Sequence, residues 1–255
     1  MNRPFNPFSL EGKFFLVTGA ASGIGKVTSI VLSKLGANLI LLDINQSGLE
    51  ETHNSCKSTD VILTFDLTKI KTLKDELLNS VSGFGKLHGF VHLAGKPYVS
   101  PLKTISEEKC AEIYTLNTYS ALELSKIFIG KNIYAGEKGS IVFVSSVYGF
   151  VGSAANVGYA MSKSALHGIT RSLSIELATK GIRVNCVAPG FVKTNMMNNI
   201  NGSFTDDHIN VLNKLHPLGL GEPEDIAYSI AYLLSAAAKW VTGSILNIDG
   251  GFTAQ

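Results

Sequence analysis

Two side chains with acid–base chemistry, those of Tyr159 and Lys163, lie four residues apart in the segment Tyr-Ala-Met-Ser-Lys. On a helix, positions i and i+4 share one face, so the ammonium of Lys163 would lie beside the phenol of Tyr159. A nearby cation favours the phenolate and therefore lowers the pKa of a tyrosine toward the working pH. Such a group can give and take a proton with little driving force, as a general acid–base requires. The same spacing also occurs in helices that use both residues only structurally.

Two further polar residues fit the same chemistry. Ser146 precedes Tyr159 by 13 residues and ends an apolar run, where a strand would stop. A serine at this place can donate a hydrogen bond to a substrate oxygen as negative charge develops on it. Alternatively, Ser146 or its neighbour Ser145 caps the turn that follows. Asn117 lies in a helical stretch, where an asparagine is otherwise an exposed polar residue or marks a bend.

A glycine-rich turn, Thr-Gly-Ala-Ala-Ser-Gly-Ile-Gly, spans residues 18–25 directly after the first apolar run. Glycine permits positive φ and close approach of the backbone to a ligand. The helix that begins at this turn would offer free N–H groups and a positive dipole end to a pyrophosphate. A tight turn without a ligand is the alternative. The residues expected to hold the pyrophosphate are Gly19, Ser22, Gly23, Ile24 and Gly25.

Asp43 ends the second apolar run, 18 residues after the last glycine of the turn. A carboxylate at this distance is placed to accept hydrogen bonds from the adenosine ribose hydroxyls of a dinucleotide. The same carboxylate would repel the 2′-phosphate of NADP, because unpaired like charges in contact are costly. The expected cofactor is therefore NAD. The alternative role for Asp43 is that of a helix cap or turn residue before Asn45.

The elements that must position these residues alternate along the chain. Near-continuous apolar runs are typical of strands that are covered on both faces, as in a parallel sheet. Strands are expected at 14–18, 38–43, 61–66, 87–92, 140–145, 183–188 and 244–248, and helices at 24–35, 70–81, 107–116, 121–133, 160–178 and 224–234. This order predicts an α/β fold, a doubly wound, mostly seven-stranded parallel sheet with helices on both faces (Rossmann type). Ligands of such sheets bind beyond the carboxyl ends of the strands.

Length and composition bound the possible functions. The chain has 255 residues, 45% hydrophobic and 16% charged, which excludes disorder as the main state. Without a linker or repeat, residues 1–255 are predicted to form one domain. A net charge of +2 without a long basic run gives nucleic-acid binding no support. No membrane span, secretory signal, disulfide framework or metal site is expected, and the three separate cysteines favour reduced thiols in the cytoplasm.

The turn spacing Gly-x-x-x-Gly-x-Gly, the Tyr-x-x-x-Lys motif, the preceding serine and the helical asparagine together resemble the short-chain dehydrogenase/reductase family. This resemblance implies hydride transfer between a nicotinamide dinucleotide and a secondary alcohol or ketone. Tyr159 would be the acid–base, Ser146 would hold the substrate oxygen, Lys163 would bind the nicotinamide ribose and Asn117 would hold a water in a proton relay. The family pattern also implies that Tyr159 and Lys163 contact the cofactor together with Asp66, Leu67, Ala94, Gly95, Pro189, Gly190, Val192 and Thr194.

One segment departs from the family pattern. The family commonly has Asn-Asn-Ala-Gly after the fourth strand, whereas this chain has His92-Leu93-Ala94-Gly95. Leu93 replaces an asparagine that ties the strands and the nicotinamide ribose together, so some backbone hydrogen bonds must be made in another way. His92 is expected to be structural, as a buried histidine at a strand end, rather than a ligand or a base.

The substrate is expected between the segments that follow the fourth, fifth and sixth strands. Residues 191–220 show no continuous helical period and carry Met196, Met197, Ile200 and Phe204 among asparagines, a composition typical of a lid. A plain surface excursion is the alternative. The apolar and aromatic lining does not choose between a sugar, an acyl thioester, a steroid and a small hydroxy acid.

Two other functions stay open. One is a 3-oxoacyl carrier-protein reductase of fatty-acid synthesis, which usually uses NADPH; Ser22, where a basic residue often lies, and Asp43 argue against it. The other is a non-catalytic dinucleotide-sensing regulator, which would usually lack the tyrosine or the lysine. Family members commonly pair their long helices, so we expect a homo-oligomer, a dimer or a homotetramer. A small-molecule alcohol or ketone is the expected partner.

Overall fold

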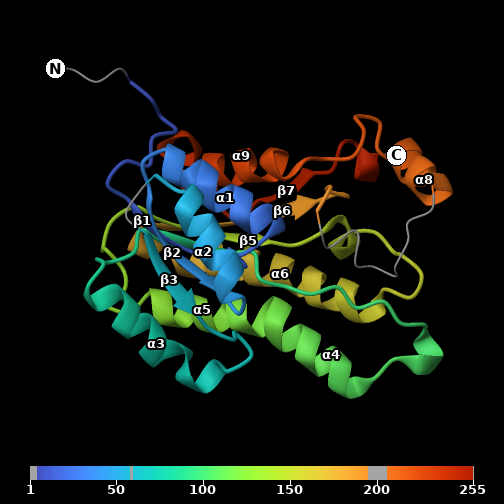
Figure 1. Cartoon of the computed structure of the whole chain (residues 1–255), viewed down its shortest axis with the longest axis horizontal. Helices are drawn as coiled ribbons and strands as arrows, with labels where there is room; N and C mark the ends of the chain where they lie inside the picture. The colour runs from blue at the N-terminus through green and yellow to red at the C-terminus, as the bar shows by residue number, and fades with distance from the viewer. Residues whose placement is uncertain (1–4, 58–59, 195–205, 255) are drawn as a thin grey trace.

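The structure is a computed structural model that describes residues 5–57, 60–194 and 206–254. Seven parallel strands form one sheet in the order β3-β2-β1-β4-β5-β6-β7 (Figure 1). The strands are β1 (Phe14–Thr18), β2 (Asn38–Asp43), β3 (Asp60–Thr64), β4 (Gly89–His92), β5 (Gly139–Val144), β6 (Ile182–Pro189) and β7 (Ile245–Ile248). The predicted doubly wound parallel sheet is confirmed.

Helices cover both faces of this sheet (Figure 1). They are α1 (Gly23–Lys34), α2 (Gln46–Ser55), α3 (Ile70–Ser82), α4 (Glu107–Tyr114), α5 (Ser120–Phe128), α6 (Val157–Glu176), α8 (Asp206–Leu215) and α9 (Pro223–Leu234). Alternate residues of the buried strands supply two hydrophobic clusters. Leu16 of β1 packs on the side of α3, α5 and α6, whereas Phe15 and Val17 pack on the side of α1, α2 and α9. Continuous apolar strands are needed because both faces are buried.

The strand order places a topological switch point between β1 and β4. From β1 the chain proceeds to β2 and β3 on one side, and from β4 it proceeds to β5, β6 and β7 on the other. The connections leaving β1 and β4 therefore diverge, and a crevice opens beyond the carboxyl ends of these two strands. The glycine turn after β1 and the segment after β4 both face this crevice.

Two helices among the described residues were not predicted from the sequence. The helix α2 has the sequence Gln-Ser-Gly-Leu-Glu-Glu-Thr-His-Asn-Ser, in which Leu49 is the one large apolar residue, so it carries almost no hydrophobic period. Asn45 caps it by accepting a hydrogen bond from the N–H of Gly48 at 3.2 Å. The helix α8 falls in the segment 191–220, for which no continuous helical period was expected. Met196, Met197, Ile200 and Phe204 lie outside the described residues.

Some expected boundaries shift. The third strand is Asp60–Thr64 rather than 61–66, so Asp66 lies in the loop that follows it. The helix expected at 121–133 ends at Phe128, and Gly130 turns the chain back toward the sheet, where Tyr134 pairs with Leu87 in an isolated bridge. Within the described part of the chain, no helix is both long enough and apolar enough to cross a membrane.

Candidate active site

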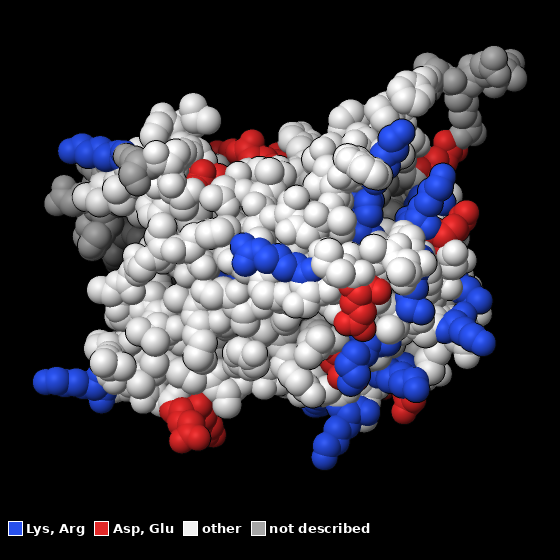
Figure 2. Space-filling view, turned by 180° about the vertical axis from the view of Figure 1, so that it is seen from behind, with Lys and Arg blue, Asp and Glu red and all other residues white. Residues whose placement is uncertain are grey.

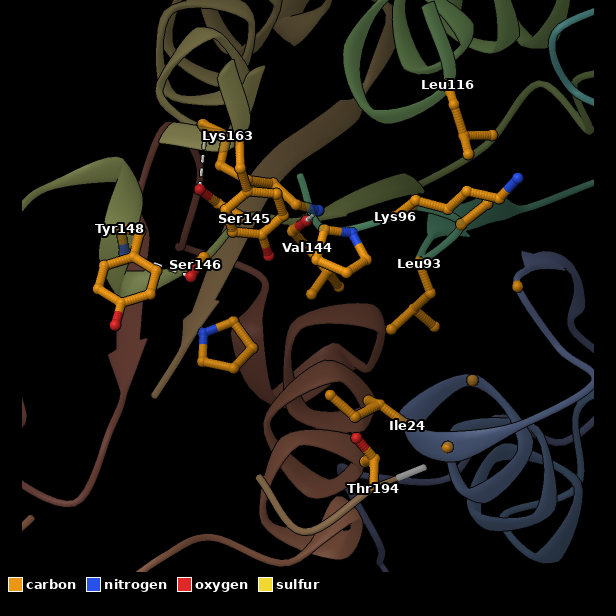
Figure 3. Close-up of a pocket in the computed structure, with 18 of the residues that line it drawn as sticks. Ile24, Leu93, Lys96, Leu116, Val144, Ser145, Ser146, Tyr148, Lys163 and Thr194 are labelled. Atoms are coloured by element: carbon orange, nitrogen blue, oxygen red, sulfur yellow. Dashed lines mark hydrogen bonds between the residues drawn. The ribbon is translucent and has the colours of Figure 1, made fainter. Parts of the chain in front are cut away.

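A cavity of about 1140 Å³ lies at the carboxyl ends of the strands. With one exception, every residue predicted from the sequence to bind the cofactor or to act in catalysis lines this cavity. The exception is Asn117, which is fully buried behind it. Figure 3 shows Thr194 and Ile24 on one side of the cavity, opposite Lys163, Ser145, Ser146 and Tyr148. The structure therefore brings together residues from all parts of the sequence.

The glycine turn leaves room for a ligand at the start of α1. Gly19 has φ +70° and lies so close to the segment after β4 that a Cβ would be 2.9 Å from the backbone nitrogen of Ala94. A Cβ at Gly25 would be 1.9 Å from the carbonyl oxygen of Gly19. Ser22, the N-cap, makes no side-chain capping bond, and the first turn of α1 carries no acidic residue. Its free N–H groups and dipole thus fit an anionic group such as a pyrophosphate.

Two carboxylates lie at the end of the cavity expected to bind adenosine. Asp43 accepts hydrogen bonds from the backbone N–H groups of Ala21 at 3.2 Å and Asn45 at 3.0 Å, which fixes its orientation. Asp66 accepts from the backbone N–H and the hydroxyl of Thr68, at 2.9 and 2.8 Å. Burial raises the pKa of Asp66, but the Thr68 hydrogen bonds and nearby lysines outweigh it and hold that pKa below its ordinary value. Both side chains can accept hydrogen bonds from a ligand.

The hydroxyl of Thr18 connects β1 to the segment after β4, where Leu93 stands in place of the asparagine of the family pattern. It accepts hydrogen bonds from the backbone N–H groups of Leu93 and Ala94, each at 3.1 Å. It also lies 3.2 Å from Nδ1 of His92, whose Nε2 is 3.3 Å from the hydroxyl of Ser120. Burial, and the charge of Lys163, lower the pKa of His92 to about 3, so the ring is neutral. These contacts make His92 structural, as predicted, and leave the side chain of Leu93 on the cavity wall.

The ammonium of Lys163 is held inside the site by the backbone. It donates a hydrogen bond to the carbonyl oxygen of Val144 at 2.8 Å and lies 5.8 Å from the centre of the Tyr159 ring. Lys163 is only 5% exposed, and burial lowers its pKa to about 8. A lysine with this pKa can lose its charge near neutral pH, which an exposed lysine does not.

The pKa of Tyr159 differs from the sequence-based prediction. Its ring is partly open to the cavity, but burial raises the pKa to about 12, and Tyr148 adds to the rise. A hydrogen bond with Ser146 opposes this rise. The charge of Lys163 was expected to lower the pKa, yet its ammonium is engaged by the carbonyl of Val144. In the protein by itself, burial therefore raises the pKa of Tyr159, and the lowering that was expected from the charge of Lys163 is not seen.

The two adjacent serines have different roles. Ser146 caps a 3₁₀ turn (Val147–Gly149) by accepting a hydrogen bond from the N–H of Tyr148 at 3.2 Å, while its side chain also lines the cavity beside Tyr159. Ser145 donates to the carbonyl oxygen of Lys163 at 2.9 Å and lies 2.8 Å from Nε2 of His167. Ser145 thus joins the end of β5 to α6, whereas Ser146 combines the cap with a hydrogen bond to Tyr159.

Asn117 lies in a π-helical turn, Thr115–Tyr119, between α4 and α5. Such turns are rare and are frequently found at functional sites. The Asn117 amide accepts from the N–H of Lys96 at 2.9 Å and donates to the carbonyl oxygen of Lys96 at 3.1 Å and to the hydroxyl of Ser162 at 3.0 Å. A Cβ at Gly95 would be 3.0 Å from Asn117 Oδ1 and 3.3 Å from Lys163 Nζ. Asn117 therefore adjoins the lysine but mainly holds the loop after β4.

One buried residue near the site was missed. His216 follows α8 and is 1% exposed. Its Nε2 accepts a hydrogen bond from the N–H of Phe191 at 3.2 Å, and its Nδ1 lies 2.7 Å from the carbonyl oxygen of Leu212. Since Leu212 offers only an acceptor, Nδ1 carries the proton and the ring is neutral. His216 thereby joins α8 to the segment that follows Gly190. A single histidine before a proline gave no sequence signal for this role.

Among residues 5–57, 60–194 and 206–254, no three His, Cys, Asp or Glu side chains are grouped to hold a metal ion. The segment predicted as a lid, 191–220, lies only partly within these residues. In its described part, Val192 pairs with Gly221, and Thr194 lies next to Gly23, since a Cβ at Gly23 would be 3.5 Å from its side chain. The motion of this segment stays a prediction.

Comparison with known proteins gives consistent matches over nearly the whole chain. A family model described as enoyl-(acyl carrier protein) reductase matches residues 19–253. The chain is 35% identical over 243 residues to a 3-oxoacyl-(acyl-carrier-protein) reductase of Rickettsia prowazekii, which covers 95% of this chain and 97% of that protein.

Two solved structures that are similar to this chain contain a nicotinamide dinucleotide. A 7α-hydroxysteroid dehydrogenase complexed with NADH and 7-oxoglycochenodeoxycholic acid matches with a TM-score of 0.88 and 30% identity, covering 97% of both chains. A 2-deoxy-D-gluconate 3-dehydrogenase, so named provisionally, from Agrobacterium tumefaciens carries bound NADP. It matches with a TM-score of 0.88 and 30% identity over 98% of this chain and 100% of that chain.

Proposed function

The chain belongs to the short-chain dehydrogenase/reductase family of oxidoreductases, and from this premise we propose that it transfers a hydride between NAD(H) and a secondary alcohol or ketone. The observation that carries this proposal is the placement of Tyr159, Ser146 and Lys163 in one cavity with the glycine turn at the start of α1. A nicotinamide dinucleotide supplies or accepts the hydride when it is bound. The residues proposed to hold it are those of the turn, Asp43, Asp66 and the ends of β4 and β6.

We propose Tyr159 as the group that moves the proton. With a pKa of about 12, its phenol is protonated at neutral pH and can donate to a carbonyl oxygen as that oxygen gains negative charge. In the oxidation direction the phenol must first lose its proton to act as a base. Ser146 holds the same oxygen, since its hydroxyl lines the cavity beside the phenol. Lys163, held by the carbonyl oxygen of Val144, is proposed to bind the nicotinamide ribose. Asn117 accepts a hydrogen bond from the N–H of Lys96, which holds that loop in place, and is proposed to hold a water.

The proposed preference for NAD rests on the charges around Asp43. Among the described residues that line the cavity, the basic side chains are Lys96 and Lys163. Lys26, on α1, is paired with Glu51 at 3.0 Å. A 2′-phosphate beside Asp43 would therefore meet a carboxylate without a compensating cation from this lining.

Calorimetric titration with NAD and NADP tests this preference. The wild type should bind NAD more tightly than NADP, because contact between the Asp43 carboxylate and the 2′-phosphate of NADP costs on the order of several kcal/mol. Asp43→Ala removes this repulsion and should reduce the difference in affinity between the two cofactors. Equal or tighter binding of NADP by the wild type would contradict the assignment.

A 3-oxoacyl carrier-protein reductase is the second candidate, supported by the similarity to the Rickettsia enzyme. NADPH-linked reduction of an acetoacetyl thioester, faster than NAD-linked oxidation of any simple alcohol, would favour it. A regulator without turnover is a weaker candidate, because Tyr159 and Lys163 are both present and both in the cavity.

The experiment that tests the proposed function follows absorbance of the reduced nicotinamide with a panel of secondary alcohols and ketones. We expect turnover that depends on Tyr159. No turnover in either direction with either dinucleotide would contradict the proposal.

We further propose that residues 1–255 act as one domain, in the cytoplasm, and assemble as a homo-oligomer of two or four copies. The support for assembly is that α6 exposes large apolar side chains: Val157 is 52%, Met161 50% and Ile175 77% exposed. Figure 2 shows a broad, mostly uncharged face, with the charged side chains gathered mainly toward one side. Apolar surface of this kind is typical of a contact between subunits.

A further inference from the structure

Asn156 occupies the N-cap position of α6, yet its side chain makes no capping hydrogen bond. By contrast, Asn45 at the start of α2 accepts from the N–H of Gly48, as a capping asparagine usually does. Asn156 is only 8% exposed, and it lines the cavity. Within the described part of the chain, its amide has no hydrogen-bond partner. Asn156 is not among the residues whose unpartnered polar atoms are sealed from solvent, so its amide is reached from the cavity that it lines. A group that enters the cavity can therefore supply the missing hydrogen-bond partner.

The position of Asn156 relative to Tyr159 follows from the helix. The carbonyl oxygen of Asn156 accepts from the N–H of Ala160 at 2.8 Å, so helical spacing begins at this residue. Asn156, Tyr159 and Lys163 are then related by i, i+3 and i+7 and lie along one face. Lys163 is at the cofactor end of this row, which places Asn156 at the opposite end, about 5–6 Å from Tyr159 between Cβ atoms. A group bound by Asn156 would thus lie close to the oxygen that Tyr159 protonates.

The surroundings of Asn156 are neutral. The N–H of Ser100 donates to the carbonyl oxygen of Ala155 at 2.7 Å, which joins the loop after β4 to the loop before α6. The uncharged residues of these loops that line the cavity include Leu93, Pro97, Val99, Val147, Ser153 and Ala154. Both lysines that line it are engaged elsewhere, since the ammonium of Lys163 is held by Val144. Figure 3 shows Lys96 across the cavity from Tyr148 and Ser146, pointing away from them; its charge acts on Asp66 and Glu112.

We infer that Asn156 is a specificity-determining residue that hydrogen-bonds a second, neutral oxygen of the substrate, carried on a carbon one or two bonds from the one that is oxidised. The substrate class is therefore 1,2- and 1,3-diols with the corresponding hydroxyketones. A carboxylate at this place would lack a counter-charge from the described lining. This inference rests on the proposed function and deepens it.

The test compares matched substrates that differ by one oxygen: cyclohexanol with 1,2-cyclohexanediol, 2-butanol with 2,3-butanediol, and 2-pentanol with 2,4-pentanediol. For the wild type, kcat/KM should favour the diol about tenfold or more in at least one pair, because a site built to bond a hydroxyl rejects the analogue that lacks it. Asn156→Leu should bring this ratio to about one. Asn156→Asp, which keeps an acceptor, should retain most of the preference for the diol.

A matched control separates substrate binding from helix capping. Ser106 caps α4 by accepting from the N–H of Lys109 at 3.2 Å, so Ser106→Ala should lower thermal stability without changing the diol ratio. Equal kcat/KM for both members of every pair would overturn the inference while leaving the proposed function intact. So would an equal loss for both members in Asn156→Leu, or a preference for 3-hydroxybutyrate over 2,3-butanediol. Turnover of no member of any pair would overturn both the inference and the proposed function.

Discussion

At the scale of single residues, the properties of the site come from burial more than from neighbouring charges. Tyr159 and Lys163 are both shifted toward their neutral forms, the phenol to a pKa of about 12 and the amine to a pKa of about 8. The motif could be found in the sequence, because it consists of residue types at fixed spacing. The pKa values could not, because they depend on how deeply the folded chain encloses each group.

The first prediction concerns Tyr159 itself. Tyr159→Phe removes only the hydroxyl and should lower kcat by about 10²–10⁴-fold, the usual contribution of general acid–base catalysis. Affinity for NAD, measured by calorimetry, should stay close to that of the wild type. Tyr134→Phe is a matched control, since that hydroxyl bonds the carbonyl oxygen of Lys180 outside the cavity. Near-normal turnover of Tyr159→Phe would move the proton transfer to Ser146 or a water.

The second prediction is the pH dependence of oxidation. Since burial raises the pKa of Tyr159 to about 12, the phenol is protonated below that pH and the fraction ionised grows as pH rises. In steady-state assays, kcat/KM for an alcohol should therefore increase with pH, by up to about tenfold per unit. Ketone reduction uses the protonated phenol and should lack this rise. A flat profile for oxidation by the wild type would argue against Tyr159 as the base.

The third prediction concerns the cost of burying Lys163. Its pKa is about 8 in the folded chain against an ordinary value of 10.5, so the unfolded chain binds more protons between those pH values. The free energy of unfolding should therefore rise with pH across this window through Lys163. Lys163→Met removes the contribution of Lys163 to the pH dependence of stability. The same change should also abolish cofactor binding. Denaturant titrations at several pH values, with the exposed Lys103→Met as control, test this. Parallel pH dependence in wild type and Lys163→Met would contradict it.

At the scale of elements, regular hydrophobic patterns were predicted and polar or irregular ones were not. The strands β1 and β2 match their predicted bounds, because their apolar runs end in polar residues at the glycine turn and at Asp43. The polar helix α2 was not predicted. The π turn at Asn117 joins two helices that were expected to be separated by a short break. The role of Thr18 could not be predicted either, since it depends on the pairing of β1 with β4.

The fourth prediction belongs to the link between α8 and β6. His216→Ala leaves the N–H of Phe191 without its acceptor and should lower the free energy of unfolding by about 1–3 kcal/mol. Cofactor affinity should fall as well, because Phe191 follows the cavity-lining Gly190. Denaturant unfolding and NAD titration measure the two effects. Lys214→Ala, an exposed change on α8, is the control and should alter neither. Unchanged NAD affinity in His216→Ala would show that this histidine does not position the site.

At the scale of the whole molecule, the fifth prediction is assembly through α6. Light scattering at micromolar concentration should show a dimer or tetramer of the wild type. Met161→Lys places a charge on a half-exposed apolar position and should shift the population toward smaller species. Val211→Lys changes a similarly exposed residue on α8 and serves as the control. A stable monomer of the wild type would contradict assembly.

The pairing of β1 with β4 also has a consequence for how the protein acquires its activity during synthesis. The contact between Thr18 and His92 joins residues 74 positions apart, and β5 and α6 must be added before Lys163 can reach Val144. Non-local parallel pairing of this kind closes long loops and slows folding. A nascent chain that has been synthesised only as far as β3 contains the whole glycine turn, but it lacks the segments after β4, β5 and β6 that line the other half of the cavity. Activity should therefore appear in one late step, when the second half of the sheet docks on β1.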